Sequence, residues 1–257
     1  MRRIALACLM AVLLSPVARA AEKIPITIRD KALTLELYLP KAGTTPRGTV
    51  FMGSGDVGWV GLGVDLSEFL SGEGYAVVGI NVRQYLSSFT SRTGHVTTDQ
   101  VPRDYAAIAQ LLRDRHTLWE PVVVAGVSEG AALAVVAGAD PANHAWVKGV
   151  LTMGLPPSAE LAWRWTDITS WITKKDAAEP SFEPHVFIAG VSPIPLWMIH
   201  STKDEYVTEA DFRRFEREAG APKRLVLIDA SNHRFTDRLP QLRQQVLAGL
   251  VWMRNPT

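Results

Sequence analysis

The 257-residue sequence predicts an α/β fold in which helices flank a mostly parallel sheet of about eight strands. Segments rich in β-branched and aromatic residues alternate with helical patterns along the chain. From the third segment onward, most of the strand-like segments are almost continuously apolar, which is typical of strands covered on both faces. Hydrophobic residues make up 47% of the chain, enough for one sizeable core, so we expect a single domain.

The expected strands follow one another at regular intervals. The first two are separated only by DKA at 30–32, which predicts a hairpin at an antiparallel edge of the sheet. The full set of expected strands is 24–29, 33–39, 49–52, 75–80, 121–125, 148–153, 195–200 and 224–229.

Helices are expected between these strands and after the last one. Thr208 is placed to cap the fourth helix. Two insertions, 82–100 and 154–193, break the alternation of strand and helix. The expected helices are 65–74, 101–115, 129–139, 208–220 and a C-terminal helix with Leu242, Val246 and Leu250 on one face.

The first twenty residues have the pattern of a secretory signal peptide. Arg2 and Arg3 precede the apolar run IALACLMAVLL, and small residues follow it, which predicts cleavage between Ala20 and Ala21. The apolar run is too short to cross a bilayer. We therefore expect an exported, soluble protein whose folded domain spans 21–257.

Cysteine content and charge exclude several functions. Cys8, the only cysteine, lies in the expected signal peptide, so a disulfide or a cysteine nucleophile is not expected in the mature chain. Three of the 27 basic residues also lie there, leaving 24 against 26 acidic residues and a formal net charge of −2. This balance gives no electrostatic case for nucleic-acid binding.

The segment GVSEG at 126–130 stands between an apolar strand and an alanine-rich helix. A serine in such a turn is strained and exposed at the carboxyl edge of the sheet, and the flanking glycines permit close backbone approach. The backbone N–H of Glu129 is then available to a developing oxyanion. This pattern predicts Ser128 as a nucleophile, the alternative being an ordinary glycine-bounded helix start.

Two further groups are expected at the same edge of the sheet. Asp204 follows the seventh strand and His233 follows the eighth, and the chain order serine, aspartate, histidine is that of α/β-hydrolases. In that arrangement the histidine takes the serine proton, and the aspartate fixes the histidine tautomer. Glu205 and Asp229 are the alternative acids.

The glycine-rich loop GSGDVGW at 53–59 follows the third strand. In α/β-hydrolases a loop at this position supplies a second oxyanion donor. We expect the backbone N–H of Asp56 in this role, with that of Gly55 next. The alternative is an ordinary glycine turn.

Four segments together resemble the VirJ/AcvB family of exported bacterial proteins, within the α/β-hydrolase superfamily. Members are associated with type IV secretion and virulence, and AcvB-like members are periplasmic hydrolases that remove the amino acid from lysyl-phosphatidylglycerol. The resemblance implies a triad of Ser128, Asp204 and His233, and it departs from the family pattern at Val57, where a glycine is usual. The four segments are SGDVGW at 54–59, VVGINVRQYLSSF at 77–89, TTDQVPRDYAAI at 97–108 and GVSEG.

The insertion at 154–193 lies between the sixth and seventh strands, where this fold commonly has a lid. Trp165 belongs to an apolar helical stripe that Lys174 and Lys175 follow, which suggests a lipid-facing wall with a cationic rim. The alternative is a stripe that packs on the core, with solvated lysines.

Three more residues are expected to contact substrate. Arg83 and Tyr85 lie just past the fourth strand, and Trp59 ends the glycine-rich loop. The Arg83 guanidinium could pair with a phosphate or carboxylate of the substrate, the alternative being a structural salt bridge.

The leading hypothesis is a periplasmic serine hydrolase that cleaves carboxylic esters, with aminoacyl-phosphatidylglycerol as the specific substrate. A small-ester esterase, a thioesterase and a peptidase stay open within this class. The alternative outside the hydrolases is a non-catalytic secretion accessory that uses the fold as a binding module.

The expected partners are a small-molecule or lipid ester, the membrane surface through peripheral contact, and secretion-system proteins. No nucleotide or redox cofactor is expected, because the sequence holds no motif for one. No metal is expected either, because no ligand spacing such as HxxxH occurs.

Overall fold

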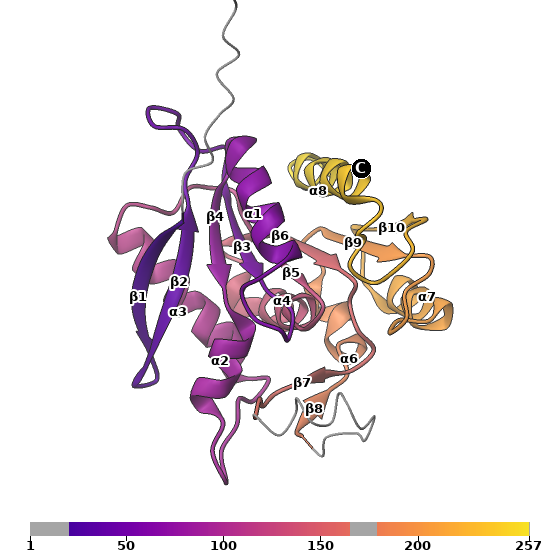
Figure 1. Ribbon diagram of the computed structural model, residues 1–257, viewed down its shortest axis with the longest axis horizontal. Helices are drawn as coiled ribbons and strands as arrows, with labels where there is room; N and C mark the ends of the chain where they lie inside the picture. Colours follow the sequence, from indigo (N-terminus) through magenta and orange to yellow (C-terminus); the bar gives the residue numbers. More distant parts are fainter. Residues whose placement is uncertain (1–20, 165–178, 257) are drawn as a thin grey trace, which may run out of the picture.

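Eight strands form one twisted sheet in the order β1-β2-β4-β3-β5-β6-β9-β10 (Figure 1). The structure is a computed structural model, and it describes residues 21–164 and 179–256. The strands are β1 Glu22–Ile28, β2 Lys31–Tyr38, β3 Thr49–Gly53, β4 Ala76–Ile80, β5 Val122–Val127, β6 Val147–Met153, β9 Leu196–Ser201 and β10 Lys223–Ile228.

The sheet is antiparallel at one edge and parallel elsewhere. β1 pairs with β2, and β2 with β4, in antiparallel register. Every other neighbouring pair, from β4 across to β10, is parallel. The prediction of a mostly parallel eight-stranded sheet with an edge hairpin is therefore confirmed.

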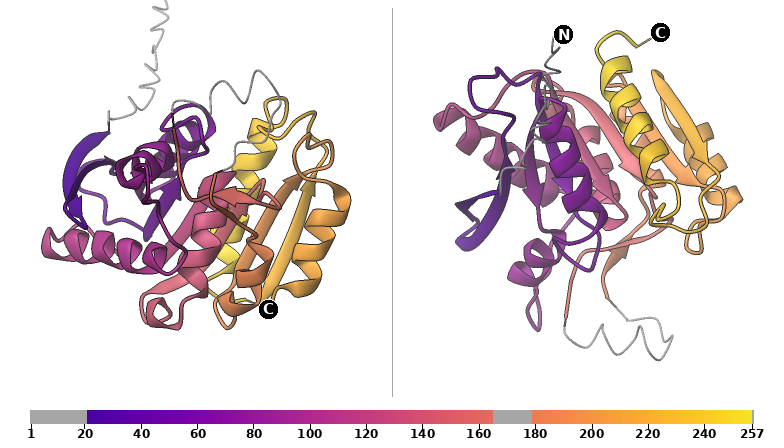
Figure 2. Two further views of the ribbon diagram at one scale, coloured as in Figure 1. Left: turned by 90° about the horizontal axis from the view of Figure 1, so that it is seen from below. Right: turned by 45° about the horizontal axis from the view of Figure 1, so that its top comes forward.

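Helices cover both faces of the sheet, as the further views show (Figure 2). On one face, α1 and α8 pack over side chains such as Met52 and Val123. On the other, five helices pack over side chains such as Phe51 and Val124. The helices are α1 Leu62–Gly72, α2 Val82–Phe89, α3 Gln100–Asp114, α4 Glu129–Ala139, α6 His185–Ile188, α7 Glu209–Glu218 and α8 Leu239–Trp252.

The local sequence accounts for most of these elements. β3, β4 and β5 are buried along their whole length, as their continuous apolar sequences predict. Thr208 caps α7 as expected, in a reciprocal capping box with Asp211. Helix α2 was not expected, because the insertion at 82–100 lacks a long apolar stripe; Asn81 starts it by accepting a hydrogen bond from the Gln84 backbone N–H.

The insertion at 154–193 is described only in part. β7 Ala159–Glu160 pairs with β8 Ser181–Phe182 in a separate two-stranded sheet, and α6 follows. Trp165, Lys174 and Lys175 lie outside the described residues, as does the expected signal peptide.

A buried polar cluster ties the edge hairpin to the helices behind it. Arg29, in the turn between β1 and β2, donates from Nε and Nη2 to the two carboxylate oxygens of Asp104, at 3.1 and 2.8 Å. The Tyr85 hydroxyl donates to the same carboxylate at 2.6 Å. Asp104 on α3 therefore joins β1, β2 and α2 through one side chain.

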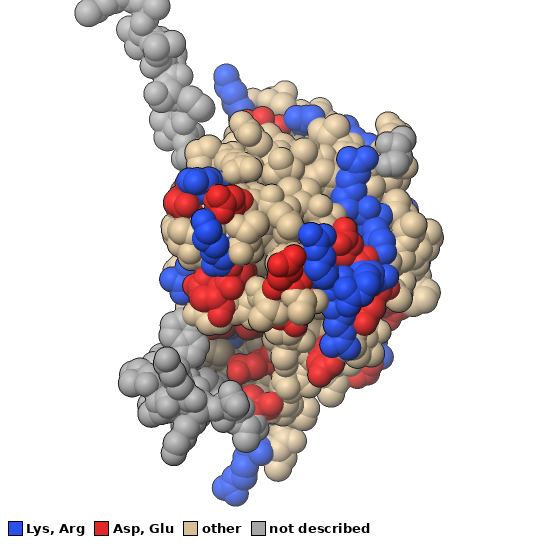
Figure 3. Space-filling model, turned by 90° about the vertical axis from the view of Figure 1, so that its right-hand side faces the viewer, with Lys and Arg blue, Asp and Glu red and all other residues tan. Residues whose placement is uncertain are grey.

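Charges are intermixed on the face over α7 and β10 (Figure 3). Arg214 pairs with Glu218, and Lys203 with Asp229, both at 3.0 Å. Exposed pairs of this kind contribute little to stability. Among the helices the structure describes, none is long and apolar enough to cross a membrane.

Candidate active site

Ser128 occupies the sharp turn between β5 and α4. Its φ is 53° and its ψ is −120°, a region that non-glycine residues seldom adopt. The Ser128 backbone N–H donates to the Met153 carbonyl on the neighbouring strand at 3.0 Å. The surrounding structure thus holds the serine in the strained geometry that the GVSEG pattern predicts.

Three glycines make this turn sterically feasible. A Cβ on Gly126 would lie 2.1 Å from the Gly130 carbonyl carbon, and a Cβ on Gly130 would lie 2.5 Å from that of Gly53. The first turn of α4 therefore lies directly against the ends of β3 and β5, closer than any side chain would allow.

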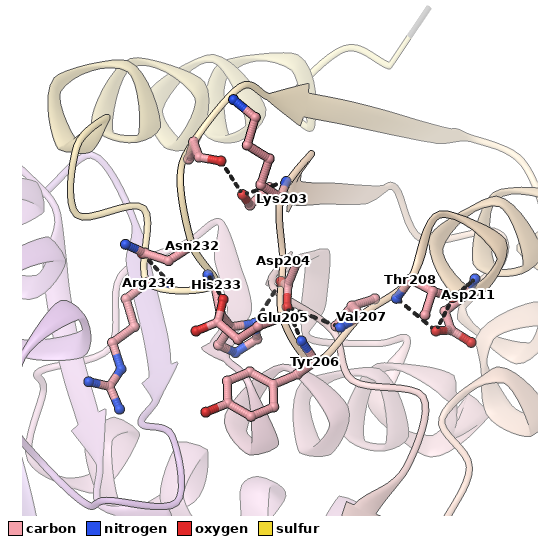
Figure 4. Close-up of polar contacts among 12 residues, drawn as sticks. Lys203, Asp204, Glu205, Tyr206, Val207, Thr208, Asp211, Asn232, His233 and Arg234 are labelled. Carbon is pink, nitrogen blue, oxygen red and sulfur yellow. Dashed lines mark hydrogen bonds and ion pairs between the residues drawn. The ribbon is translucent and has the colours of Figure 1, made fainter.

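His233 and Asp204 meet at the carboxyl ends of β10 and β9 (Figure 4). His233 Nδ1 lies 2.7 Å from Asp204 Oδ2, and the Asp204 side chain is fully buried. The other carboxylate oxygen of Asp204 accepts from the backbone N–H groups of Tyr206 and Val207 at 2.9 and 3.0 Å. The carboxylate is thus fixed on three sides and orients the imidazole.

These contacts decide the protonation state of Asp204. Burial acts to raise its pKa, but the hydrogen bond and charge of His233 and the two backbone N–H groups outweigh it. The pKa of Asp204 therefore lies below its usual value, and the group is ionised at neutral pH.

The two alternative acids contact other groups. Glu205 Oε2 accepts from the backbone N–H of His233 at 2.8 Å, so it holds the loop and not the ring. Asp229 is exposed, and its Oδ1 is 3.0 Å from both Lys203 Nζ and Thr202 Oγ1. Of the three carboxylates, the structure brings Asp204 to the imidazole.

A cavity of about 560 Å³ opens beside these groups. Its wall includes Ser128 and His233, which therefore face a common space; Asp204 lies behind His233. The wall comes from loops at the carboxyl ends of five strands: 55–57 and 60–63 after β3, 127–129 after β5, 156–158 after β6, Tyr206 after β9, and 233–234 after β10.

The two ring nitrogens of His233 differ in their contacts. Its Nε2 is buried and has no hydrogen-bond partner among the described residues. Gly154 closes the other side of the ring, since a Cβ there would lie 2.6 Å from Cε1 of His233. The imidazole is thus clamped by Asp204 and Gly154.

The glycine-rich loop after β3 lies beside the serine. A Cβ on Gly55 would lie 3.6 Å from Cβ of Ser128, and both Gly55 and Asp56 line the cavity. The Asp56 carboxylate accepts from the backbone N–H of Val57 at 2.9 Å, which stabilises the turn. The expected oxyanion donors, including the Glu129 backbone, therefore belong to the cavity wall.

The side chain of Glu129 was not expected in the site. Its Oε2 is buried and has no hydrogen-bond partner within the described ranges. Burial and the nearby Asp56 carboxylate raise the pKa of Glu129. Hydrogen bonds from Ser128 and from its own backbone N–H, and the charge of His233, lower the pKa by less, so its pKa lies above the usual value. In the sequence, the only signal for this is an acid directly after the predicted nucleophile.

Tyr206 and Arg234 are two more unexpected residues of the cavity wall. The Tyr206 ring meets the His233 ring edge-on at 5.3 Å. Arg234 is exposed, and in Figure 4 its side chain extends away from Asp204. Arg234 directly follows His233 and Tyr206 lies two residues after Asp204, and this nearness to the predicted triad is the signal that could have identified them.

Tyr85 and Trp59, both expected to contact substrate, are not among the residues lining this cavity. Tyr85 is buried, and its hydroxyl donates to Asp104. The Trp59 indole N–H donates to the Tyr38 hydroxyl at 3.0 Å, and its ring lies against Gly79. The substrate role of both residues stays a prediction.

Arg83 stacks on Trp163, with its guanidinium carbon 4.1 Å from the ring centroid, and is not among the residues lining the cavity. Its substrate role stays a prediction, as does that of Trp165, which lies outside the described residues. Within 21–164 and 179–256, no cluster of three His, Cys, Asp or Glu side chains could hold a metal ion.

Solved structures share this fold. The esterase domain of a Rhodothermus marinus protein is similar with a TM-score of 0.62 and 19% identity, covering 91% of this chain and 98% of that one. Est1E from Butyrivibrio proteoclasticus has a TM-score of 0.65 and 14% identity, covering 91% and 99%. XC6422 from Xanthomonas campestris, an α/β serine hydrolase without a lid, has a TM-score of 0.58 and 17% identity, covering 90% and 94%.

At these identities the likeness shows the fold, which is that of the α/β-hydrolases. No curated protein matches the sequence. The model of one family, bacterial virulence protein (VirJ), matches residues 48–246. The matched region runs from β3 to α8 and contains every residue of the cavity wall. The chain therefore belongs to the VirJ family of bacterial virulence proteins, with an α/β-hydrolase fold.

Proposed function

We propose that this protein is a serine hydrolase that cleaves carboxylic esters through Ser128, His233 and Asp204. The observation that carries the proposal is the 2.7 Å contact between His233 Nδ1 and the buried Asp204, beside a cavity shared with a strained Ser128. The family resemblance to periplasmic hydrolases points the same way.

In the first half of the reaction, Ser128 Oγ bonds to the ester carbonyl carbon while His233 Nε2 takes the hydroxyl proton. The carbonyl oxygen becomes an oxyanion and accepts from the backbone N–H groups of Glu129 and of Asp56 or Gly55. The bond to the alcohol oxygen then breaks, and the imidazolium gives its proton to that oxygen.

In the second half, water adds to the acyl-enzyme and His233 takes its proton. The bond between the acyl carbon and Ser128 Oγ breaks, the serine regains a proton from the imidazolium, and the carboxylic acid leaves. Asp204 stays ionised throughout, stabilising the imidazolium.

Labelling with a fluorophosphonate tests the nucleophile directly. We expect the wild-type protein to be labelled and Ser128→Ala to remain unlabelled, with the same melting temperature to show that the variant is folded. A folded wild-type protein that is not labelled would contradict the proposal and favour the secretion-accessory binding module.

As the specific substrate we propose aminoacyl-phosphatidylglycerol, in the periplasm. Incubation with lysyl-phosphatidylglycerol in detergent micelles should release free lysine, and Ser128→Ala should release none. Release by both proteins would point to a contaminant, and release by neither, with fluorophosphonate labelling intact, would leave an esterase for another ester.

The location has its own test. Expression of the full chain followed by fractionation should recover the protein from the periplasm with Ala21 as its first residue, the predicted cleavage product. Recovery from the cytoplasm with the first twenty residues retained would contradict the location and leave the ester chemistry untouched.

A further inference from the structure

The Glu129 side chain lies in the site, yet the triad does not use it. The acid of the triad is Asp204, on the far side of His233. Glu129 lines the same cavity as Ser128, Asp56 and His233, and its Oε2 is buried without a hydrogen-bond partner among the described residues. Because Glu129 directly follows the nucleophile, it lies beside the acyl group that Ser128 would carry.

This carboxylate lacks a compensating cation. Neither Glu129 nor Asp56 makes an ion pair in the described part of the chain, and Glu129 Oε2 is buried without a hydrogen bond. A buried carboxylate with a second carboxylate nearby is costly unless a proton or a cation neutralises it. A ligand that brings a positive charge would remove this cost.

The opposite charge lies elsewhere on the cavity wall. Arg234 lines the cavity next to His233, is exposed, and extends away from Asp204 (Figure 4). A cationic ligand group would be repelled by its guanidinium and attracted to the carboxylates beside Ser128. The cavity wall therefore carries both signs of charge, with acidic side chains at Asp56 and Glu129 and a basic one at Arg234.

We propose that Glu129, with Asp56 beside it, forms a subsite for a cationic group, such as an ammonium, on the acyl half of the substrate ester. The subsite rests on the proposed ester hydrolysis, because it assigns the acyl side of the same cavity. An ammonium there would donate charge-assisted hydrogen bonds to Glu129, including its unpartnered oxygen. A neutral acyl group would leave both carboxylates uncompensated.

Matched pairs of methyl esters test the subsite. Glycine against propanoate differs by an ammonium in place of a methyl group, and lysine against norleucine differs at the end of the side chain. For each pair the selectivity is the kcat/KM of the more cationic ester divided by that of its partner. Methanol release gives both values at neutral pH, where the ammonium groups are charged.

We expect wild-type selectivity for at least one pair, and a fall in that selectivity of at least about tenfold in Glu129→Gln, the range of a hydrogen bond to a charged group. Asp56→Asn should lower the same selectivity less. Asp229→Asn, an exposed carboxylate outside the cavity, is the matched control and should leave it unchanged. A wild type without selectivity, or a Glu129→Gln variant that retains it, would overturn the proposal.

A binding measurement separates this proposal from the proposed function. The same pairs are tested as amides with Ser128→Ala: glycinamide against propionamide, and lysinamide against norleucinamide. In the pair for which the wild-type enzyme is selective, the more cationic amide should bind more tightly. Adding Glu129→Gln should remove that difference. Equal binding of charged and neutral amides would overturn the subsite even if esters are hydrolysed, whereas a charge preference without any hydrolysis would contradict only the esterase.

Discussion

Asp204 and Glu205 are neighbours in sequence that bind different parts of the same histidine. Asp204 contacts the ring at Nδ1, while Glu205 accepts from the backbone N–H of His233. The first contact fixes the tautomer that leaves Nε2 able to take a proton, and the second fixes the loop that carries the ring. In the proposed mechanism, Asp204 therefore acts on the imidazole, whereas its neighbour Glu205 acts only on the position of the loop.

Asp204→Asn is expected to lower kcat by about 10⁴-fold, because an amide favours the wrong imidazole tautomer while leaving the geometry intact. Hydrolysis of a neutral methyl ester measures the loss. Asp229→Asn, the matched control at the end of β10, should retain wild-type kcat. A larger loss in Asp229→Asn than in Asp204→Asn would reassign the acid of the triad.

His200 on β9 is a buried histidine with a structural role. Its ring is 0% exposed and lies 5.6 Å from the ring of Phe212 and 6.1 Å from that of Phe215. Neither ring nitrogen has a hydrogen-bond partner among the residues described. Burial is the main cause that lowers the pKa of His200 from 6.5 to about 4.

The shift makes folding stability depend on pH. Between the two pKa values the unfolded chain binds more protons at this position, so the free energy of unfolding falls as the pH falls through this window. From about pH 7 to about pH 5 the loss is about 2 kcal/mol. His200→Phe keeps an aromatic ring and should remove this part of the dependence.

Urea unfolding of both proteins at the two pH values measures the difference. Other titrating groups act equally in both proteins and cancel in the comparison. Parallel curves for wild type and His200→Phe would show that His200 is protonated in the fold, contrary to its buried setting.

At the scale of elements, the turn from β5 into α4 depends on backbone contact. A Cβ on Gly130 would lie 2.5 Å from the carbonyl carbon of Gly53 and 2.6 Å from the carbonyl oxygen of Ser54. Both contacts are with backbone, which cannot rotate away as a side chain can. α4 would have to move, and Ser128 with it.

Gly130→Ala should therefore lower the free energy of unfolding by about 3 kcal/mol, as overpacking of a rigid core does. Gly72→Ala is the matched control: it lies at the end of α1 with nothing within 4 Å of its Cβ position, so it should be neutral or slightly stabilising. Urea denaturation compares the two. Equal effects would mean that the contact with β3 is not rigid.

The sequence predicted the elements that depend on local patterns, but not those that depend on contacts between distant parts of the chain. The eight strands and the turn at Ser128 follow local patterns of apolar runs and glycines, and these were confirmed. Helix α2 was missed because its buried residues are few, and the role of Tyr85 depends on Asp104, which lies 19 residues away. The candidate triad followed from chain order, whereas the burial of the Glu129 carboxylate depends on how α4 packs.

At the scale of the whole molecule, one ion pair joins the antiparallel edge to the parallel body. Arg29 binds the buried Asp104, which also accepts from Tyr85. Arg29→Gln should destabilise the protein by about 2 kcal/mol, less than the roughly 3–5 kcal/mol for a fully buried pair because Arg29 is partly exposed. Urea unfolding measures the loss.

A comparison variant isolates the cause. Lys23→Gln removes a basic residue of the same hairpin whose side chain is mostly exposed and whose contact with Glu36 is long, at 4.0 Å. It should change the free energy of unfolding very little. If the two variants were equally stable, the connection between the hairpin and α3 would be apolar packing alone.

The order of the strands along the chain decides when the candidate site is completed during synthesis or export. Ser128 is made halfway through synthesis, but His233 follows the edge strand β10, which can pair only with β9. A ribosome-bound or translocating chain that has not yet released β10 and the residues after it carries Ser128 without His233, its proposed base. The proposed hydrolysis would therefore begin only once β10 has paired with β9, and a chain cut before β10 would lack it whatever its earlier structure.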